Sequence, residues 1–498
     1  MTAAPTTDEY RTLITRALGV ALDADTNGPD PRRLFTPSSH RLALDPDVTV
    51  VRGARGTGKT FWAKALIDPD LREVAARSYM MPRLRRVRVT TGFATGGGTS
   101  TPYPSKRKIA RLLRGTTGHE IHEVFWRAVV MMALDVPEIT RIPDWADRVR
   151  WAEENEDAYE DALDEADQEA QGSGETRVLL FDALDHLHAD RATADRLVSA
   201  LFQVALELRL TTGALRAKIF VRPDMYDSAP KAFPDASKLG ANMAELTWSR
   251  ENLYGLLFHL LGNDQGPEAE KFRAEYGGWT AGEEGRFTAP VDVIADEKCQ
   301  EQVFGALAGT YMGTDRRKGH TFTWVPNHLQ DGKGRVSPRT WLLALRKAAA
   351  LTTERYAGHP YALHYDAIRE SLHEASRVRV DELKEDIGWA AAAIKQLEGG
   401  QVPMEPSYVH YMWERGGLTG ILRDMAETDH GTEGPEDEQD ENPKGGSGPR
   451  DAGDSFALIE ELVDLGVLTK RSSGGLDLPD VYRLAFDIGR KGGVPRKS

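Results

Sequence analysis

The sequence of 498 residues has little cysteine and no long apolar run. Its single cysteine excludes a disulfide framework and a metal cluster built from several cysteines. The longest apolar stretches, such as residues 128–134, are far shorter than the roughly 20 residues that cross a bilayer. The first residues also lack the charged region and apolar core of a secretory signal. We therefore expect a cytoplasmic protein with no membrane partner.

Acidic residues outnumber basic ones by 77 to 63, which gives a net charge of −14. This excess is local, because residues 153–169 hold ten acidic residues and no basic one, and residues 427–454 hold ten acidic and two basic residues. The rest of the chain is mildly basic. The net charge therefore does not exclude a nucleic acid or another anionic partner.

Short apolar runs alternate with helical patterns between residues 41 and 260. The run 178–181 is apolar throughout, which is typical of a parallel strand covered on both faces. The alternation predicts an α/β fold, with a parallel sheet between helices. Strands are expected at 48–51, 84–90, 178–181 and 217–221, and helices at 59–67, 106–113, 121–134 and 193–208.

The composition changes several times along the chain. Helical spacing of apolar residues recurs beyond residue 248, at 250–261, 339–352, 365–376 and 380–397. The acidic segment near residue 440 holds no large apolar residue, so we expect it to be disordered. The predicted parts are a lead-in with one short helix (1–40), an α/β core (41–260), a helical lid with an insertion (261–426), an acidic disordered linker (427–454) and a winged-helix-like segment (455–498).

The core contains a P-loop pattern, G-x-x-x-x-G-K-T, between a predicted strand and a predicted helix. Its glycines let the backbone wrap around phosphate with the N–H groups pointing inward. Lys59 is expected to reach the β- and γ-phosphates and Thr60 to hold Mg²⁺, so the predicted cofactors are ATP and Mg²⁺. The predicted cofactor-binding residues are Gly53, Ala54, Arg55, Gly56, Thr57, Gly58, Lys59 and Thr60.

Two aspartates follow the apolar strand at 178–181. A P-loop needs a carboxylate at the end of a neighbouring strand to organise magnesium, which predicts Asp182 as the second metal-binding residue beside Thr60. Asp185 lies three residues on and is predicted to polarise the attacking water as general base. The alternative for Asp185 is an N-cap of the next helix.

The P-loop together with residues 179–185 resembles the ATPase core of the AAA+/STAND group of P-loop ATPases. Members of that group often carry Asp-(Gly/Ala)-x-Asp-Glu after this strand, whereas His186 stands here at the glutamate position. The resemblance implies an Mg²⁺-dependent ATPase, and the departure at His186 implies slow turnover. It further implies an oligomeric switch of the kind found in bacterial antiviral defence or signalling, with a separate effector protein as partner.

Weaker similarities concern arginines. Residues 218–224 are similar to the strand that carries a γ-phosphate sensor in related ATPases, which implies this catalytic role for Arg222. The alternative is a solvated arginine that caps a loop. Residues 337–342 are similar to the start of a lid helix from which an arginine reaches the nucleotide, which implies Arg339 or Arg346.

A basic segment at residues 82–115 holds nine basic residues and no acidic one. It could follow a phosphate backbone, and basic residues in the tail (Arg483, Arg490, Lys491, Arg496 and Lys497) are compatible with a wing on DNA. The alternative is that the segment pairs with the acidic helix at 153–169. Two other functions therefore stay open: a DNA-associated ATPase, such as an initiator, partition or mobile-element factor, and a nucleotide-gated scaffold with little turnover.

Overall fold

A computed structural model describes residues 4–22, 30–95, 101–114, 119–188, 190–430, 448–491 and 494. The chain forms two compact units, here called the sheet unit (Ser38–Leu246 with Asp424–Pro449) and the helical unit (Met1–Pro37, Thr247–Arg423 and Arg450–Ser498). The polypeptide therefore begins in the helical unit, builds the sheet unit and returns. The five-part division stays a prediction, and residues 431–447 of the predicted linker lie outside the described residues.

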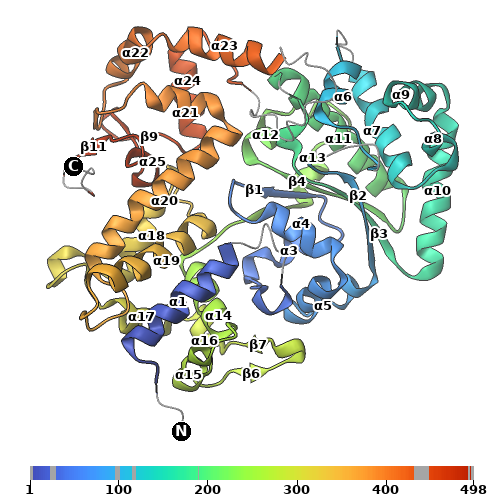
Figure 1. Cartoon of the computed structure of the whole chain (residues 1–498). Helices are drawn as coiled ribbons and strands as arrows, with labels where there is room; N and C mark the ends of the chain where they lie inside the picture. The colour runs from blue at the N-terminus through green and yellow to red at the C-terminus, as the bar shows by residue number, and fades with distance from the viewer. Residues whose placement is uncertain are drawn as a thin grey trace. The chain divides into compact units, whose positions relative to one another are not determined.

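The sheet unit is built on five parallel strands in the order β2-β3-β4-β1-β5. The P-loop strand β1 lies between β4 and β5, with Val50 opposite both Ile219 and Met243. Because every pair is parallel, all the carboxyl ends meet at one edge of the sheet. The strands are β1 (Val50–Gly53), β2 (Val87–Phe93), β3 (Thr176–Phe181), β4 (Leu215–Val221) and β5 (Met243–Leu246). The predicted α/β class, with a parallel sheet between helices, is confirmed (Figure 1).

Helices cover both faces of this sheet: α4 (Lys59–Ile67) and α5 (Pro69–Ser78) lie on one face, and α7 (His119–Ala133) and α11 (Arg191–Thr211) on the other (Figure 1). Side chains alternate along each strand, so Leu179 and Phe181 join the core shared with α7 and α11. Leu180 points to the opposite face and is equally buried. Burial on both faces explains why the strand is apolar throughout.

Further helices of the sheet unit surround this core. They are α6 (Lys106–Leu112), α9 (Trp145–Glu154), α10 (Glu156–Ser173) and α12 (Pro223–Ser228). Trp126 of α7 packs edge-on against Phe181 with the ring centres 5.6 Å apart, and its indole N–H donates to the carbonyl of Leu197 in α11 at 2.7 Å. The aromatic ring thus ties the helical layer to the strand that precedes the two aspartates.

The helical unit packs α1 (Thr7–Leu22) against α14 (Arg250–Gly262) and α19 (Pro338–Arg355). The region between α14 and α19, part of the predicted lid with its insertion, contains α15 (Pro267–Glu275), α17 (Glu297–Ala308) and α18 (Thr321–Leu329). None of the helices in the described ranges combines the length and apolar character that a bilayer-spanning segment needs.

One helix boundary was predicted wrongly. Residues 365–376 and 380–397 were expected to form two helices divided near residue 378, but α20 (Tyr365–Asp386) continues without interruption. The break lies at Ile387, whose backbone has φ −136° and ψ 61°, and α21 (Gly388–Lys395) begins at the glycine that follows. Helical spacing of apolar residues runs through this point because both helices bury the same kind of side chain.

The predicted winged-helix-like segment begins before residue 455. Its core joins α21, α22 (Pro406–Arg415) and α24 (Ser455–Asp464) to the antiparallel hairpin of β9 (Thr469–Lys470) and β10 (Leu476–Asp477). Met404, which follows β8 (Gln401–Val402), pairs with Leu476 through two backbone hydrogen bonds of 2.8 and 2.7 Å. This part of the chain thus contains three helices, a hairpin and a third extended segment, and its assignment as a winged helix stays a prediction.

Burial of a histidine makes the helical unit sensitive to acid. His259 of α14 is 3% exposed and lies against Phe35 with ring centres 5.6 Å apart. Burial, aided by the positive charge of Arg286, lowers the pKa of His259 to about 3. A histidine in the unfolded chain has a pKa near 6.5. As the pH falls below that value, the unfolded chain binds a proton at this residue and the folded chain does not.

We therefore expect the free energy of unfolding to fall as the pH drops from 6.5 toward 3, and His259→Gln to remove this part of the loss. Between pH 7.5 and 5.0 the variant should lose about 2 kcal/mol less than the wild-type chain. Urea unfolding at both pH values measures the difference. Equal losses in the two proteins would contradict the prediction.

Candidate functional site

The P-loop connects β1 to α4, and its glycines are required by close contacts and by backbone conformation. A Cβ atom on Gly53 would lie 2.6 Å from Oγ1 of Thr57 and 3.0 Å from Cγ of Lys59. Gly58 caps α4 with φ +98°, in the left-handed region that side chains disfavour. The backbone can therefore curl back on itself at the point where the N–H groups of α4 are unpaired within the helix.

Lys59 sits at the centre of this curl. Its Nζ donates a hydrogen bond of 2.9 Å to the carbonyl of Gly53 and a longer one of 3.4 Å to that of Ala54. Burial lowers the pKa of Lys59, and the nearby carboxylates of Asp185 and Asp182 oppose that shift. Among the described residues the ammonium group of Lys59 thus donates hydrogen bonds to backbone carbonyls alone. An anionic oxygen can replace these carbonyls as the acceptor.

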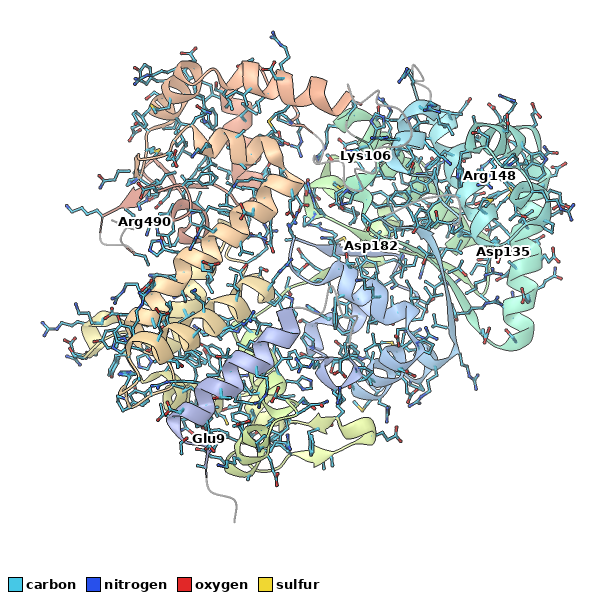
Figure 2. The ribbon with its side chains drawn as sticks, in the orientation of Figure 1. Glu9, Lys106, Asp135, Arg148, Asp182 and Arg490 are labelled. Atoms are coloured by element: carbon cyan, nitrogen blue, oxygen red, sulfur yellow. The ribbon has the colours of Figure 1, made fainter. Side chains whose placement is uncertain are left out.

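Asp182 follows β3 at the carboxyl edge of the sheet and is 4% exposed (Figure 2). Burial raises the pKa of its carboxyl, while a hydrogen bond with the Thr60 side chain and the charge of Lys59 lower it. The Oδ1 atom has no hydrogen-bond partner among the described residues. A buried carboxylate oxygen without a partner, beside a threonine hydroxyl, is a donor set that suits Mg²⁺. These two side chains, predicted as the metal site, therefore fit that ion.

Asp185 lies in a 3₁₀ turn after Asp182. It does not cap the next helix, α11, which was the alternative role for this residue. The N-cap of α11 is Asp190, whose side chain accepts from the N–H of Thr193. Burial raises the pKa of Asp185, but the charges of Arg222, His186 and Lys59 outweigh burial and hold it below its ordinary value. Asp185 is therefore an ionised carboxylate at neutral pH, as a general base requires.

His186 is next to this carboxylate. Its Nε2 lies 3.9 Å from Oδ2 of Asp185, and its side chain is about one third exposed. The residue that stands in place of the family's glutamate is thus close to the predicted base. Its role, like that of Asp185, remains a prediction.

Arg222 is a buried charge rather than a solvated loop arginine. It lies after β4, is 6% exposed, and forms the backbone N-cap of α12. Its guanidinium makes a side-on pair with Asp224, with Nε 3.0 Å from Oδ1 and Nη2 2.6 Å from Oδ2. Burial lowers the pKa of Arg222, but Asp224 and Asp185 more than compensate and raise it. The guanidinium is therefore charged at any pH at which the chain is folded.

Two members of this charged group, Asp224 and Arg191, had no role in the sequence prediction. Arg191 opens α11 and places Nη1 3.5 Å from Oδ2 of Asp224. In the sequence, Pro223 and Asp224 have the form of an ordinary helix start, with proline at the first position and an acid in the first turn. Nothing in that local pattern indicates that Asp224 forms an ion pair with a helix more than 30 residues away along the chain.

The basic segment at 82–115 is divided by the fold. Its first part leads into β2 and holds three ion-paired arginines. Arg83 contacts Asp45 and Asp47, Arg85 contacts Glu73 at 2.8 Å, and Arg88, which lies in β2, contacts Glu169 of α10 at 3.4 Å. Only the last of these pairs joins the segment to the acidic helix that was the predicted alternative partner. The second part, α6, lies beyond the opposite end of β2.

In α6 and just after it, Arg107, Lys108, Arg111 and Arg114 show no ion pair with any described residue. Arg107, Arg111 and Arg114 are exposed. Residues 96–100 of the segment lie outside the described residues. Apart from the exposed Arg86, the basic side chains of the segment that show no ion pair among the described residues lie in α6 and just after it. The start of this helix at Lys106 is labelled in Figure 2.

The tail arginines stabilise their own domain. Arg483 is fully buried, with Nε 2.6 Å from Oδ1 of Asp480, and Arg490 pairs with both Asp477 and Asp480 at 2.6 and 2.9 Å. Neither is available for a phosphate contact, which corrects the expectation that they contribute to a DNA-binding wing. Arg496 and Lys497 lie outside the described residues.

The predicted lid arginines belong to α19 in the helical unit. Arg339 lies 3.6 Å from Glu382 of α20, and the Arg346 guanidinium lies beside Gly19 of α1, where an added Cβ atom would be 3.5 Å from it. Their action on a nucleotide stays a prediction.

No family model and no curated protein sequence match this chain. Among solved structures it is similar to one described as "Structure of the Aeropyrum Pernix ORC2 protein (ADPNP-ADP complexes)". The TM-score is 0.35 and the identity 14%, over 88% of this chain and 84% of that chain. A TM-score of 0.35 does not establish a common fold.

Proposed function

We propose that this protein binds Mg-ATP at its P-loop and hydrolyses it to ADP and phosphate as a nucleotide-dependent switch. One observation carries the proposal: Lys59, Thr60 and Asp182 converge at the carboxyl edge of the sheet, where Oδ1 of Asp182 has no partner among the described residues. A phosphate group and a hard cation together satisfy the two charges that this arrangement leaves open.

Each side chain has a distinct task in the proposed reaction. The backbone N–H groups of residues 56–60 and the ammonium of Lys59 hold the phosphate oxygens. Thr60 and Asp182 would hold Mg²⁺, which when bound neutralises charge on the β- and γ-phosphates. Asp185 accepts the proton of the attacking water, and Arg222 stabilises the negative charge that develops on the γ-phosphate.

Slow turnover is part of this proposal. His186 cannot act as a second carboxylate, so water activation falls to Asp185, whose basicity is lowered by Arg222 and Lys59. A weaker base gives a slower proton transfer, which suits a switch that stays in its ATP state for long periods. The homo-oligomer, the separate effector and the antiviral role implied by the family resemblance remain predictions, to which the described residues add nothing.

Lys59→Ala should abolish ATP binding, because it removes the only ammonium group inside the curl of the loop. Isothermal titration with MgATP measures the affinity. Lys64→Ala is the matched control, because Lys64 is exposed on the same helix and should leave binding unchanged. Retained MgATP affinity in Lys59→Ala would refute the proposed function.

Asp182→Asn should remove the dependence of nucleotide binding on magnesium while leaving binding in EDTA largely intact. The amide keeps the size of the side chain but offers a weaker, neutral ligand to the cation. We expect the gain in ATP affinity on adding Mg²⁺ to fall by about tenfold or more. A gain equal to that of the wild-type chain would show that Asp182 is not the magnesium residue.

A second candidate function, a DNA-associated ATPase, is favoured by the unpaired basic charge of α6. Arg107 and Arg111 are one helical turn apart and exposed, so both can reach the same phosphate backbone. The charge on α24, which stands where a winged helix would present its DNA-reading helix, argues against a second contact there. That helix contains Glu460, Glu461 and Asp464 and no basic residue.

If α6 binds DNA, replacing Arg107 and Arg111 with Ala should weaken binding to a duplex of any sequence and reduce the slope of log K against log salt by about two. Fluorescence anisotropy over a salt series measures both quantities. The control, Arg83→Ala with Arg85→Ala, removes the same charge from the ion-paired part of the segment and should change neither. Equal behaviour of the two variants would exclude α6 as the DNA contact.

A further inference from the structure

The predicted sensor Arg222 is the inner member of a chain of buried charges that runs from the nucleotide edge to α11. Asp224 contacts Arg222, and Arg191 contacts Asp224. We propose that Asp224 and Arg191 are positioning residues that aim Arg222 at the γ-phosphate of a bound nucleotide. This inference rests on the proposed function and adds two residues to it.

The orientation of Arg222 follows from which of its atoms Asp224 uses. The carboxylate takes Nε and Nη2, one edge of the planar guanidinium. Nη1 makes no hydrogen bond with any described residue, and it belongs to the part of the group that Asp224 leaves uncovered. Asp185 and Lys59 are close enough to Arg222 to act on it electrostatically. The side-on pair therefore fixes the plane of the guanidinium. It leaves N–H donors for an anion beside the predicted base, Asp185.

Arg191 in turn prevents Asp224 from moving. Its Nη2 donates to the backbone carbonyl of Asp224 at 3.3 Å and to Oγ of Ser228 at 2.9 Å. Its Nε lies 3.2 Å from Asp195, which also accepts from Oγ of Ser228 at 2.7 Å. The start of α11 is thus bound to both ends of α12, and Asp224 is held between two arginines.

Burial makes the three charged side chains depend on one another. The side chains of Arg222, Asp224 and Arg191 are 7%, 14% and 11% exposed, so each charge depends on its partners and not on water. Burial raises the pKa of Asp224, but Arg222 and Arg191 lower it far more, so the carboxylate stays ionised. Besides Asp224, the carboxylate that acts electrostatically on Arg222 is that of Asp185, and it would remain if Asp224 lost its charge. Arg222 would then neutralise the predicted base instead of contacting phosphate.

The test is Asp224→Asn, which keeps the shape of the side chain and removes its charge. We expect kcat for MgATP to fall about 10- to 100-fold, the cost of a misplaced group near the reacting atoms, with KM changed less than about threefold. The preference for ATP over ADP in binding should fall as well, because only ATP carries the phosphate that Arg222 would contact. The matched control is Asp227→Asn on the same helix, where the side chain is 60% exposed, and it should leave all three quantities unchanged.

A double-mutant cycle shows whether Asp224 acts through Arg222. In an Arg222→Met background, adding Asp224→Asn should cause no further loss, because the group to be positioned is gone. If Asp224→Asn does not fold, Arg191→Gln removes only the outer link and should give a smaller loss of the same kind. Circular dichroism and thermal unfolding confirm that each variant is folded.

Unchanged kcat and unchanged ATP preference in folded Asp224→Asn, or losses that simply add in the double variant, would overturn the positioning role. These outcomes leave the proposed function intact, since the wild-type chain would still bind and hydrolyse MgATP. A wild-type chain that binds no MgATP would overturn the proposed function and this inference with it.

Discussion

The proposed site depends on how the charged side chains at the carboxyl edge of the buried sheet are paired. Three basic side chains, Lys59, Arg191 and Arg222, and three aspartates, 182, 185 and 224, lie at this edge in buried or half-buried positions. A buried charge without a partner costs several kcal/mol, so the arrangement must pair each of them. Asp224 is paired with two arginines, whereas Oδ1 of Asp182 has no hydrogen-bond partner and the ammonium of Lys59 has only neutral carbonyl partners among the described residues. Those two open positions define the site.

The order of the strands produces this concentration of charge. Because all five strands are parallel, the ends of β1, β3 and β4 lie together although they are far apart in the sequence. Each of these ends is followed by a polar turn, which brings the P-loop, the Asp182–Asp185 turn and Arg222 to one edge. This is the edge where open parallel sheets bind their ligands. The apolar faces, covered by α4 and α5 on one side and by α7 and α11 on the other, keep water away from it.

Much of this could be predicted from sequence because it depends on local patterns. The P-loop, the apolar run before Asp182 and the strand before Arg222 each carry their signal within a few residues. β5 was missed because Met243–Leu246 is a short strand whose side chains alternate between buried and exposed, with no apolar run. Arg191 and Asp224 were missed for another reason, since their pairing exists only once α11 and α12 lie together. The break at Ile387 was misplaced because apolar spacing does not report a change of backbone angle.

The return of the chain to its first unit affects how the protein is made. The apolar face of α1, with Leu13, Ile14 and Leu18 almost fully buried, packs on α14 and α19, which follow residues 38–246 of the sheet unit in the sequence. Ribosomes add about 5 to 20 residues per second, so α1 leaves the exit tunnel on the order of tens of seconds before either partner. During synthesis the apolar stripe of this helix therefore lacks both of these partners while residues 38–246 are being made. All residues of the proposed nucleotide site are thus synthesised before α14 and α19.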